Sequence, residues 1–555
     1  MRSYALYIDG EDRTTENWTY AARASELMAN TVEAFDVKRA LELNRMSAKD
    51  APDYIFGRCA IGDARLGNEA LEAAHRAKSV WGRSSLSTRR EFGITLGDAI
   101  IERREELADI MVAEGHPRRL AEWEIRGMTS AMSEISVGWC ISQMREEHQI
   151  GERRLVVARK PDGVVCLNPP QNAAGSNSGL GMLALMAGNT LVVKAPRSSP
   201  LSVMFLYREI VAAVLDRFEA PSGTMNLISG DTRQILKQWV ESPLVNDIMF
   251  FGSSTRGLKL GQDCVAAGKK PILELEGNDC IVVWKDADLP AAATAICECF
   301  YGSSQICMVP KNAILHPEIA EEVIDLVLEL VQEIRPGYPE DPDVVLSPVL
   351  KADRFFDFLS DAKQQGAEVL CGGGRVDVEG QPAPSGMFLQ PTVIRVNGLS
   401  DARNLSCVRE ETFFPMLPVI VPFQNQIDLA GHIIKFLNDN LHGLRNSVWA
   451  QDPELIERFA NEVNNGGLLR INESHIGFAP LLATHGGTGR TGGPFGEMHY
   501  PSLRTSHMQG IAISPHGSHT PEDLLEEISF QGTEQLGELE LISTGAFTPR
   551  QPTRL

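Results

Sequence analysis

The stretch around which the whole chain is organised is Tyr301–Pro310, which reads YGSSQICMVP. Its cysteine, Cys307, has small and polar neighbours, so a substrate could reach the sulfur atom. The run before it is apolar at helical spacing, and the run after it is strand-like. Serine side chains and backbone N–H groups near a helix end can favour a thiolate, the nucleophilic form of cysteine. A lone cysteine in a long chain is more often buried and inert, so other parts of the chain must decide its role.

Three further stretches place polar groups beside strand-like runs, and they favour a shared site. They are PILELEGND (residues 271–279), which contains Glu274, NPPQN (168–172), which ends in Asn172, and FFGSSTRG (250–257). Each one alone is explained by an outward-facing strand residue or by ordinary turn chemistry. Their common position at strand ends, together with Cys307, favours an active site.

Size and charge limit the classes of protein that the chain can belong to. It has 555 residues, of which 43% are hydrophobic, enough for more than one domain. The 52 basic and 73 acidic residues give a net charge of −21. An acidic surface argues against nucleic acid or an anionic membrane as the main partner.

The cysteines and the N-terminus predict a cytoplasmic protein. Ten cysteines are scattered without repeated metal-ligand spacing, which suits a reducing compartment and predicts no metal site. Residues 1–10 read as a strand rather than a signal peptide, and no run is long enough to span a bilayer.

The central part of the chain alternates short apolar runs with helical segments. This rhythm, from Gly163 to Glu276, is typical of a doubly wound parallel sheet with a cofactor at the C-terminal strand ends. A second α/β unit is predicted from Asp279 to about Asn472. Upstream, residues 14–65 are predicted to be mostly irregular and residues 120–144 to form one long helix.

The order and spacing of these stretches resemble the aldehyde dehydrogenase superfamily. Its signatures are an Asn after Pro-Trp, a Lys in Val-Val-Lys, Gly-Ser-Thr-x-x-Gly, Leu-Glu-Leu-Gly-Gly and Gly-Gln-x-Cys, and the resemblance runs from about Tyr7 to Ile513. It implies an α/β fold with two doubly wound α/β domains and a protruding oligomerisation β-hairpin. The implied parts are a dinucleotide-binding domain (1–150 and 163–276), a catalytic domain (277–475), bridging strands (151–162 and 495–513) and a C-terminal extension (514–555).

The resemblance also assigns roles to individual residues. Cys307 would attack an aldehyde, Asn172 would stabilise the resulting oxyanion, and Glu274 would activate the water that hydrolyses the thioester. NAD or NADP would be the cofactor, an aldehyde the substrate, and a homodimer or homotetramer the assembly. The implied cofactor contacts are Lys194, Arg197, Gly230, Gly252, Ser253, Gly257, Leu275, Glu411 and Phe413.

Arg197 stands where many NAD-using members carry a glutamate that binds the adenosine ribose. A glutamate would repel a 2′-phosphate, whereas an arginine can pair with it at two points. We therefore hypothesise that NADP is accepted and is the preferred cofactor.

Several positions depart from the family pattern. Gln171 replaces a tryptophan, Glu276 replaces the first glycine after Leu-Glu-Leu, Asn278 replaces a lysine, and Phe414 replaces a glycine. Glu276 could alter cofactor seating, add a second acid or weaken activity, and the sequence leaves these open.

Two other functions are compatible with parts of the pattern. A CoA-acylating or thioester-reducing relative would use a thiol in place of water, but that branch commonly lacks the glutamate that matches Glu274. A catalytically weak member with a binding role is the other alternative, and Glu276 and Phe414 keep it open. The substrate is undetermined, although the loop His485–Gly493 looks like that of relatives acting on aryl or ring-derived semialdehydes.

Overall fold

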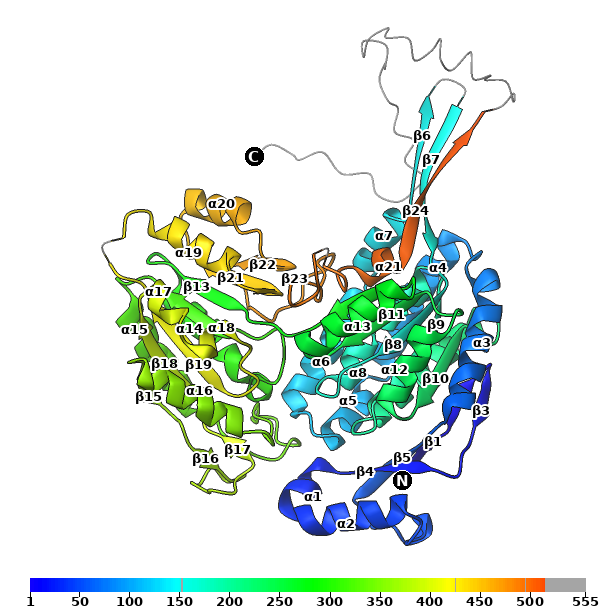
Figure 1. Ribbon diagram of the computed structural model, residues 1–555, viewed down its shortest axis with the longest axis horizontal. Helices are drawn as coiled ribbons and strands as arrows, with labels where there is room; N and C mark the ends of the chain where they lie inside the picture. Colours follow the sequence, from blue (N-terminus) through cyan, green and yellow to red (C-terminus); the bar gives the residue numbers. More distant parts are fainter. Residues whose placement is uncertain (151–152, 425, 495, 515–555) are drawn as a thin grey trace.

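The computed structural model describes residues 1–150, 153–424, 426–494 and 496–514. Two α/β units lie side by side, and a narrow sheet projects from one of them (Figure 1). The predicted C-terminal extension, 514–555, lies outside the described residues apart from Ser514. Within the described part of the chain, every helix is too short or too polar to span a lipid bilayer.

The first unit is built on a seven-stranded sheet whose five core strands are parallel. Its order is β12 (Lys270–Glu274), β11 (Asp247–Phe251), β8 (Val164–Asn168), β9 (Thr190–Ala195), β10 (Met225–Ser229), β2 (Leu6–Ile8) and β3 (Glu11–Arg13). The strands are almost wholly buried, which explains their continuous apolar sequences. Helices that cover the sheet include α3 (Ala64–Trp81), α4 (Leu86–Glu102), α9 (Leu180–Met186), α12 (Thr232–Glu241) and α13 (Ser254–Ala266).

In this sheet the chain starts at β8, runs outward through β9 and β10, and then returns to the other side of β8 with β11 and β12. The strand order therefore reverses between β8 and β11. Ligands of such sheets bind outside the carboxyl ends of the strands at this reversal. Asn168 and Phe251 end the two strands there.

The second unit contains another seven-stranded sheet. Its order is β15 (Glu368–Cys371), β18 (Thr392–Asn397), β19 (Met416–Val421), β14 (Asn312–Leu315), β13 (Cys280–Val283), β21 (Arg445–Trp449) and β22 (Leu468–Ile471). Only β15 is antiparallel. Apolar clusters fill both faces, under helices that include α14 (Leu289–Cys297), α15 (Ala320–Gln332), α16 (Asp353–Gln364) and α19 (Leu429–Asn438).

The projecting sheet consists of β6 (Arg145–Ile150), β7 (Arg153–Pro161) and β24 (Ser506–Ile513), in the order β24-β7-β6 (Figure 1). Its first strand begins before the predicted boundary at residue 151. Most side chains of β24 are exposed, and β24 and β6 form the two edges of this sheet within the described residues.

Two expectations for the N-terminal region were wrong. Residues 14–65 are largely ordered as β4 (Trp18–Ala22), α1 (Ala24–Ala29), α2 (Thr31–Glu42) and β5 (Ile55–Ala60), and β5 pairs with β4 and with β1 (Arg2–Tyr4). The predicted long helix is two helices, α6 (Arg118–Ala131) and α7 (Glu134–Ser142), because Ser133 caps the second through its hydroxyl.

Candidate active site

A cleft of about 1530 Å³ lies at the carboxyl ends of the first sheet, between the two units. Lys194, Ser253 and Glu274 line it from the first unit, and Cys307 and Glu411 line it from the second. The cleft therefore brings together residues that are separated by more than two hundred positions in the chain.

Cys307 is half-buried in this cleft, in a loop that follows α14 and a short 3-10 segment, Glu298–Ser304. It is therefore not at the start of a helix. Burial and the charges of Glu274, Glu411 and Asp279 raise the pKa of its thiol well above the usual value, and Lys311 opposes them. The expectation that its surroundings favour a thiolate is therefore wrong as far as the protein's own groups are concerned.

Lys311 fixes the backbone of the Cys307 loop. Its ammonium group is fully buried and donates to the carbonyl oxygens of Ser304 (2.7 Å), Ile306 (3.0 Å) and Thr412 (3.0 Å). One side chain thus ties the residue before Cys307 to the residue after Glu411. Sequence reasoning assigned this lysine no role because its partners are mainly backbone atoms.

Replacing Lys311 with methionine should lower the melting temperature by more than about 5 °C, because several buried carbonyls lose a charged donor at a total cost of at least about 3 kcal/mol. Thermal unfolding followed by fluorescence measures this. Lys363→Met, at an exposed position of α16, should leave the melting temperature within about 1 °C of wild type. An unchanged melting temperature for Lys311→Met would contradict the assigned contacts.

Asn172 lies where the cleft meets a second cavity, and it lines both. Its side-chain N–H group donates to the carbonyl oxygen of Gln305, at 2.8 Å. An amide nitrogen carries two hydrogens. One of them thus anchors Asn172 to the Cys307 loop, and the other is available to a substrate oxygen.

Glu274 ends β12 and is only 2% exposed. One carboxylate oxygen accepts the backbone N–H of Gly486 at 2.7 Å, while Oε1 has no partner among the described residues. Burial raises the pKa of Glu274 to about 8. A base in this range with one free oxygen can take a proton from water near neutral pH.

Gly486 has to be a glycine to hold Glu274 in this way. Its φ is +94°, and a Cβ atom there would lie 2.4 Å from the backbone nitrogen of His499. The late glycine-rich loop therefore supplies a backbone donor to the carboxylate from 212 residues further along the chain.

Lys194 lies at the adenosine end expected for a bound dinucleotide. It is buried in β9, donates to the Thr232 hydroxyl at 2.7 Å, and has a pKa that burial lowers to about 8. Arg197 is exposed just beyond the cleft, and its charge acts on Lys194 and on Lys38 of α2. Sequence reasoning missed Lys38 because it lies in the region that was expected to be irregular.

The start of α13 is suited to an anionic group. Ser253 is its N-cap and makes no side-chain cap hydrogen bond, so N–H groups of the first turn face the cleft. Gly257 lets Leu275 pack on this helix, since a Cβ atom there would lie 2.1 Å from Leu275. Gly230, by contrast, is packed against Gly62 and does not line the cleft, where Thr232 lies instead.

The cleft therefore combines a buried lysine, the start of a helix, and buried carboxyl groups in the same cleft as a cysteine. A model of the aldehyde dehydrogenase family matches residues 47–504, most of the chain. The chain belongs to the aldehyde dehydrogenase family. It is an NAD(P)-dependent enzyme that oxidises an aldehyde to the acid, so the predicted fold class and activity are confirmed.

Similar proteins share this family over nearly their whole length. A 3,6-anhydro-alpha-L-galactose dehydrogenase of Vibrio sp. is 27% identical, with 92% of this chain and 99% of the relative covered. A D-glyceraldehyde dehydrogenase (NADP(+)) of Thermoplasma acidophilum is 26% identical, with 87% and 98% covered. The solved structure of an NAD-dependent aldehyde dehydrogenase from Sinorhizobium meliloti has a TM-score of 0.77 at 23% identity, with 94% and 96% covered.

This aldehyde dehydrogenase carries Glu411 and Phe413 on the wall of the cleft that belongs to the second unit. Glu411 accepts the backbone N–H of Gly277 at 2.9 Å, and burial raises its pKa to about 7. Phe414, which departs from the family pattern, is buried against Phe355 and Phe358 and does not enter the cleft. Its backbone has negative φ, so glycine is not needed there.

Glu276 adds an acid to the cofactor cleft of this dehydrogenase. Its carboxylate lies 3.8 Å from the His442 ring, and the interactions with His442 and then with Ser254 at the start of α13 lower its pKa. A charged carboxylate therefore borders the helix start that suits a phosphate. Of the three effects considered from the sequence, the geometry favours a second acid that influences cofactor seating.

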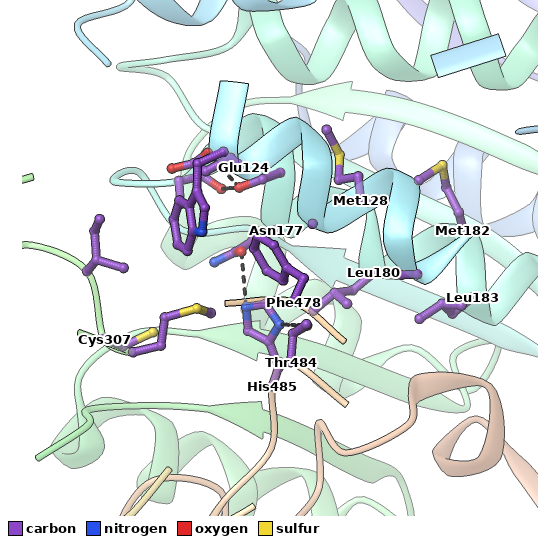
Figure 2. Close-up of a pocket in the computed structure, with 18 of the residues that line it drawn as sticks. Glu124, Met128, Asn177, Leu180, Met182, Leu183, Cys307, Phe478, Thr484 and His485 are labelled. Carbon is purple, nitrogen blue, oxygen red and sulfur yellow. Dashed lines mark hydrogen bonds between the residues drawn. The ribbon is translucent and has the colours of Figure 1, made fainter. Parts of the chain in front are cut away.

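A second cavity of about 620 Å³ adjoins the cleft at Cys307 and Asn172 (Figure 2). Its walls come from α6, α8 (Ala174–Ser178), α9 and the loop at 478–485, and are mainly methionine, leucine and aromatic. Asn177 Oδ1 accepts the N–H of His485 Nε2 at 3.1 Å, and burial lowers the pKa of His485 to about 3. His485 is therefore a neutral polar group beside the sulfur.

Proposed function

We propose that Cys307 is the nucleophile, Asn172 the oxyanion donor and Glu274 the general base of aldehyde oxidation. The observation that best supports these roles is that all three line one cleft, although they come from three distant stretches. The presence of Glu274 as a base in the cleft also favours hydrolysis of the thioester by water over its transfer to a thiol. Aldehyde-dependent reduction of the nicotinamide cofactor, compared between wild type and Cys307→Ala, tests the proposal.

The protein's own groups account for each proton and charge of the reaction. The thiol loses its proton to Glu274, the carboxylate whose charge acts most strongly on it, and sulfur attacks the carbonyl carbon. The second Asn172 N–H and the backbone N–H of Cys307 donate to the oxyanion, and losing one such donor typically costs about 10²–10³ in rate. NAD(P) held in this cleft would supply the oxidant, a hydride acceptor, and Cys307 would then carry the oxidised carbon as a thioester.

Hydrolysis of the thioester then depends on Glu274. Glu274 first releases the proton of the thiol to solvent. Its free Oε1 then takes a proton from water, which attacks the acyl carbon, and the thiol leaves with that second proton as the acid is released. The Gly486 N–H keeps the other oxygen fixed in the meantime. Glu411 and Lys194 would hold the two riboses of the cofactor.

NADP is proposed as the preferred cofactor. Burial lowers the pKa of both Lys194 and Lys38, and the charge of Arg197 adds to this effect in each, so Arg197 lies within electrostatic reach of both lysines. A 2′-phosphate would be attracted by this group and would relieve its self-repulsion.

Changing Arg197 to glutamate should reduce kcat/KM for NADP by about 100-fold and raise the relative use of NAD, because a phosphate-pairing cation becomes an anion. Steady-state kinetics with both cofactors measure this. Arg39→Glu, at an exposed position of α2 next to Lys38, controls for a general change of charge. A wild-type enzyme that strongly prefers NAD would overturn the proposal.

A cytoplasmic homodimer or homotetramer is also proposed. All ten cysteines are free thiols, in keeping with a reducing compartment. The projecting sheet of β6, β7 and β24 exposes two strand edges, and a neighbouring subunit would cover them.

A further inference from the structure

Glu124 is an acid in the wall of the cavity beside Cys307 to which the mechanism gives no role. It lies on α6 and is 4% exposed. Its Oε2 accepts the Ser176 hydroxyl at 2.7 Å, and His116 Nε2 is 3.5 Å from its Oε1. Figure 2 shows the side chain bordering the same cavity as Cys307 and His485.

One oxygen of Glu124 has capacity to accept a further hydrogen bond. Ser176 uses Oε2, and among the described residues no group hydrogen-bonds to Oε1. Buried polar groups are normally satisfied by a partner. A ligand in the cavity with a hydrogen-bond donor would satisfy the remaining hydrogen-bonding capacity of Oε1.

The surroundings of Glu124 contain no positive charge that is free for an anionic ligand. Among the described residues, neither this cavity nor the adjoining one next to α1 and α2 is lined by a lysine or an arginine. His116 faces Glu124 itself, with Nε2 3.5 Å from Oε1. Glu114 is the other acidic residue that lines the adjoining cavity. Its carboxylate accepts hydrogen bonds from the backbone N–H and hydroxyl of Ser202 and from the backbone N–H of Leu201.

The rest of the cavity is shaped for an apolar body. Trp123 and Phe478 stack with centroids 5.2 Å apart, and Met128 and Leu180 add aliphatic and sulfur contacts. A volume of about 620 Å³ is within the range of small-molecule sites. The cavity thus presents mainly apolar surface, and Glu124 is the one acidic residue among its described lining residues.

We propose that Glu124 is a specificity-determining residue that selects uncharged aldehydes with an apolar or aromatic body and a hydroxyl donor, and that it excludes aldehydes bearing a carboxylate. The inference rests on the proposed function, in which the aldehyde carbon reaches Cys307. The hydroxyl would donate to Oε1 of Glu124, and Ser176 would position the carboxyl group. A carboxylate in its place would bring acceptor oxygens against Oε1, and among the described residues no lysine or arginine lines the cavity to offset its charge.

The test is a comparison of kcat/KM among benzaldehyde, the ring isomers of hydroxybenzaldehyde and the formylbenzoates, followed by fluorescence of the reduced nicotinamide. In wild type, kcat/KM for the best hydroxybenzaldehyde should be at least about tenfold higher than kcat/KM for benzaldehyde. For every formylbenzoate, kcat/KM should be at least about tenfold lower than for benzaldehyde. Glu124→Leu should remove the hydroxyl advantage and retain benzaldehyde oxidation. Glu124→Gln should raise formylbenzoate oxidation relative to benzaldehyde.

Glu122→Gln is the matched control, because Glu122 is an exposed glutamate on the same helix. It should retain the wild-type order of substrates. Equal rates for benzaldehyde and hydroxybenzaldehyde in wild type, or an unchanged hydroxyl advantage in Glu124→Leu, would overturn this inference alone. If no aldehyde is oxidised, or if oxidation survives Cys307→Ala, the proposed function itself fails.

Discussion

Cys307→Ala should lose at least about 10⁴-fold in aldehyde oxidation while it still binds the cofactor. The reason is that no hemithioacetal or thioester forms without the sulfur, and removing a catalytic nucleophile commonly costs this much. The cofactor contacts proposed for Lys194, Ser253 and Glu411 involve other side chains. Steady-state rates with an aldehyde panel and a direct titration of NADP binding measure the two effects separately.

Cys371→Ala is the control for Cys307→Ala, since Cys371 is also a half-buried free thiol but lies in β15 of the second sheet. It should keep wild-type turnover. Oxidation that persists in Cys307→Ala would reject this cysteine as the nucleophile, whatever the fold.

Glu274→Gln should slow steady-state acid production by about 10²–10⁴-fold and leave a rapid burst of reduced cofactor. Glutamine keeps the shape of the side chain but takes no proton from water, so the thioester accumulates after the first oxidation. Stopped-flow absorbance of the reduced nicotinamide separates the burst from the slow phase.

The pH dependence supplies a second readout for Glu274. Its pKa is raised to about 8, so the carboxyl is mainly protonated at neutral pH, and hydrolysis should increase as pH rises through about 8. In Glu274→Gln this rise of the slow phase should be absent. Deacylation with wild-type rate and pH dependence in the variant would contradict the role.

Glu411→Gln is the matched comparison for Glu274→Gln, because Glu411 is a buried carboxyl in the same cleft with a pKa raised to about 7. It should raise the KM for the cofactor without accumulation of the acyl-enzyme. If Glu411→Gln accumulated the acyl-enzyme and Glu274→Gln only raised the KM for the cofactor, Glu411 would be the base and Glu274 the cofactor contact.

The sequence predicted the α/β fold because long apolar runs and helical spacing reflect burial directly. The two seven-stranded sheets follow that pattern, and the strand ends carry the polar residues that line the cleft. The N-terminal region was mispredicted because the short α1 and the exposed α2 have weak apolar periodicity. The break between α6 and α7 depends on one hydroxyl, that of Ser133, within an otherwise helical pattern.

The electrostatics of the site were not predictable from sequence alone. The raised pKa of the Cys307 thiol depends first on burial and then on carboxyl groups brought in from positions 274, 411 and 279. Similarly, Lys311 and Gly486 act through backbone groups, and residue type does not reveal such partners. In the sequence, Glu124 cannot be distinguished from a solvent-facing acid on an amphipathic helix, whereas in the structure its side chain is buried.

The most direct test of the account is to trap the acyl group on Glu274→Gln. After a single exposure to aldehyde and NADP, peptide mapping by mass spectrometry should show the peptide that contains Cys307 heavier by the mass of the aldehyde less two hydrogen atoms. Modification confined to a different cysteine, or no covalent adduct despite a burst of reduced cofactor, would contradict the account.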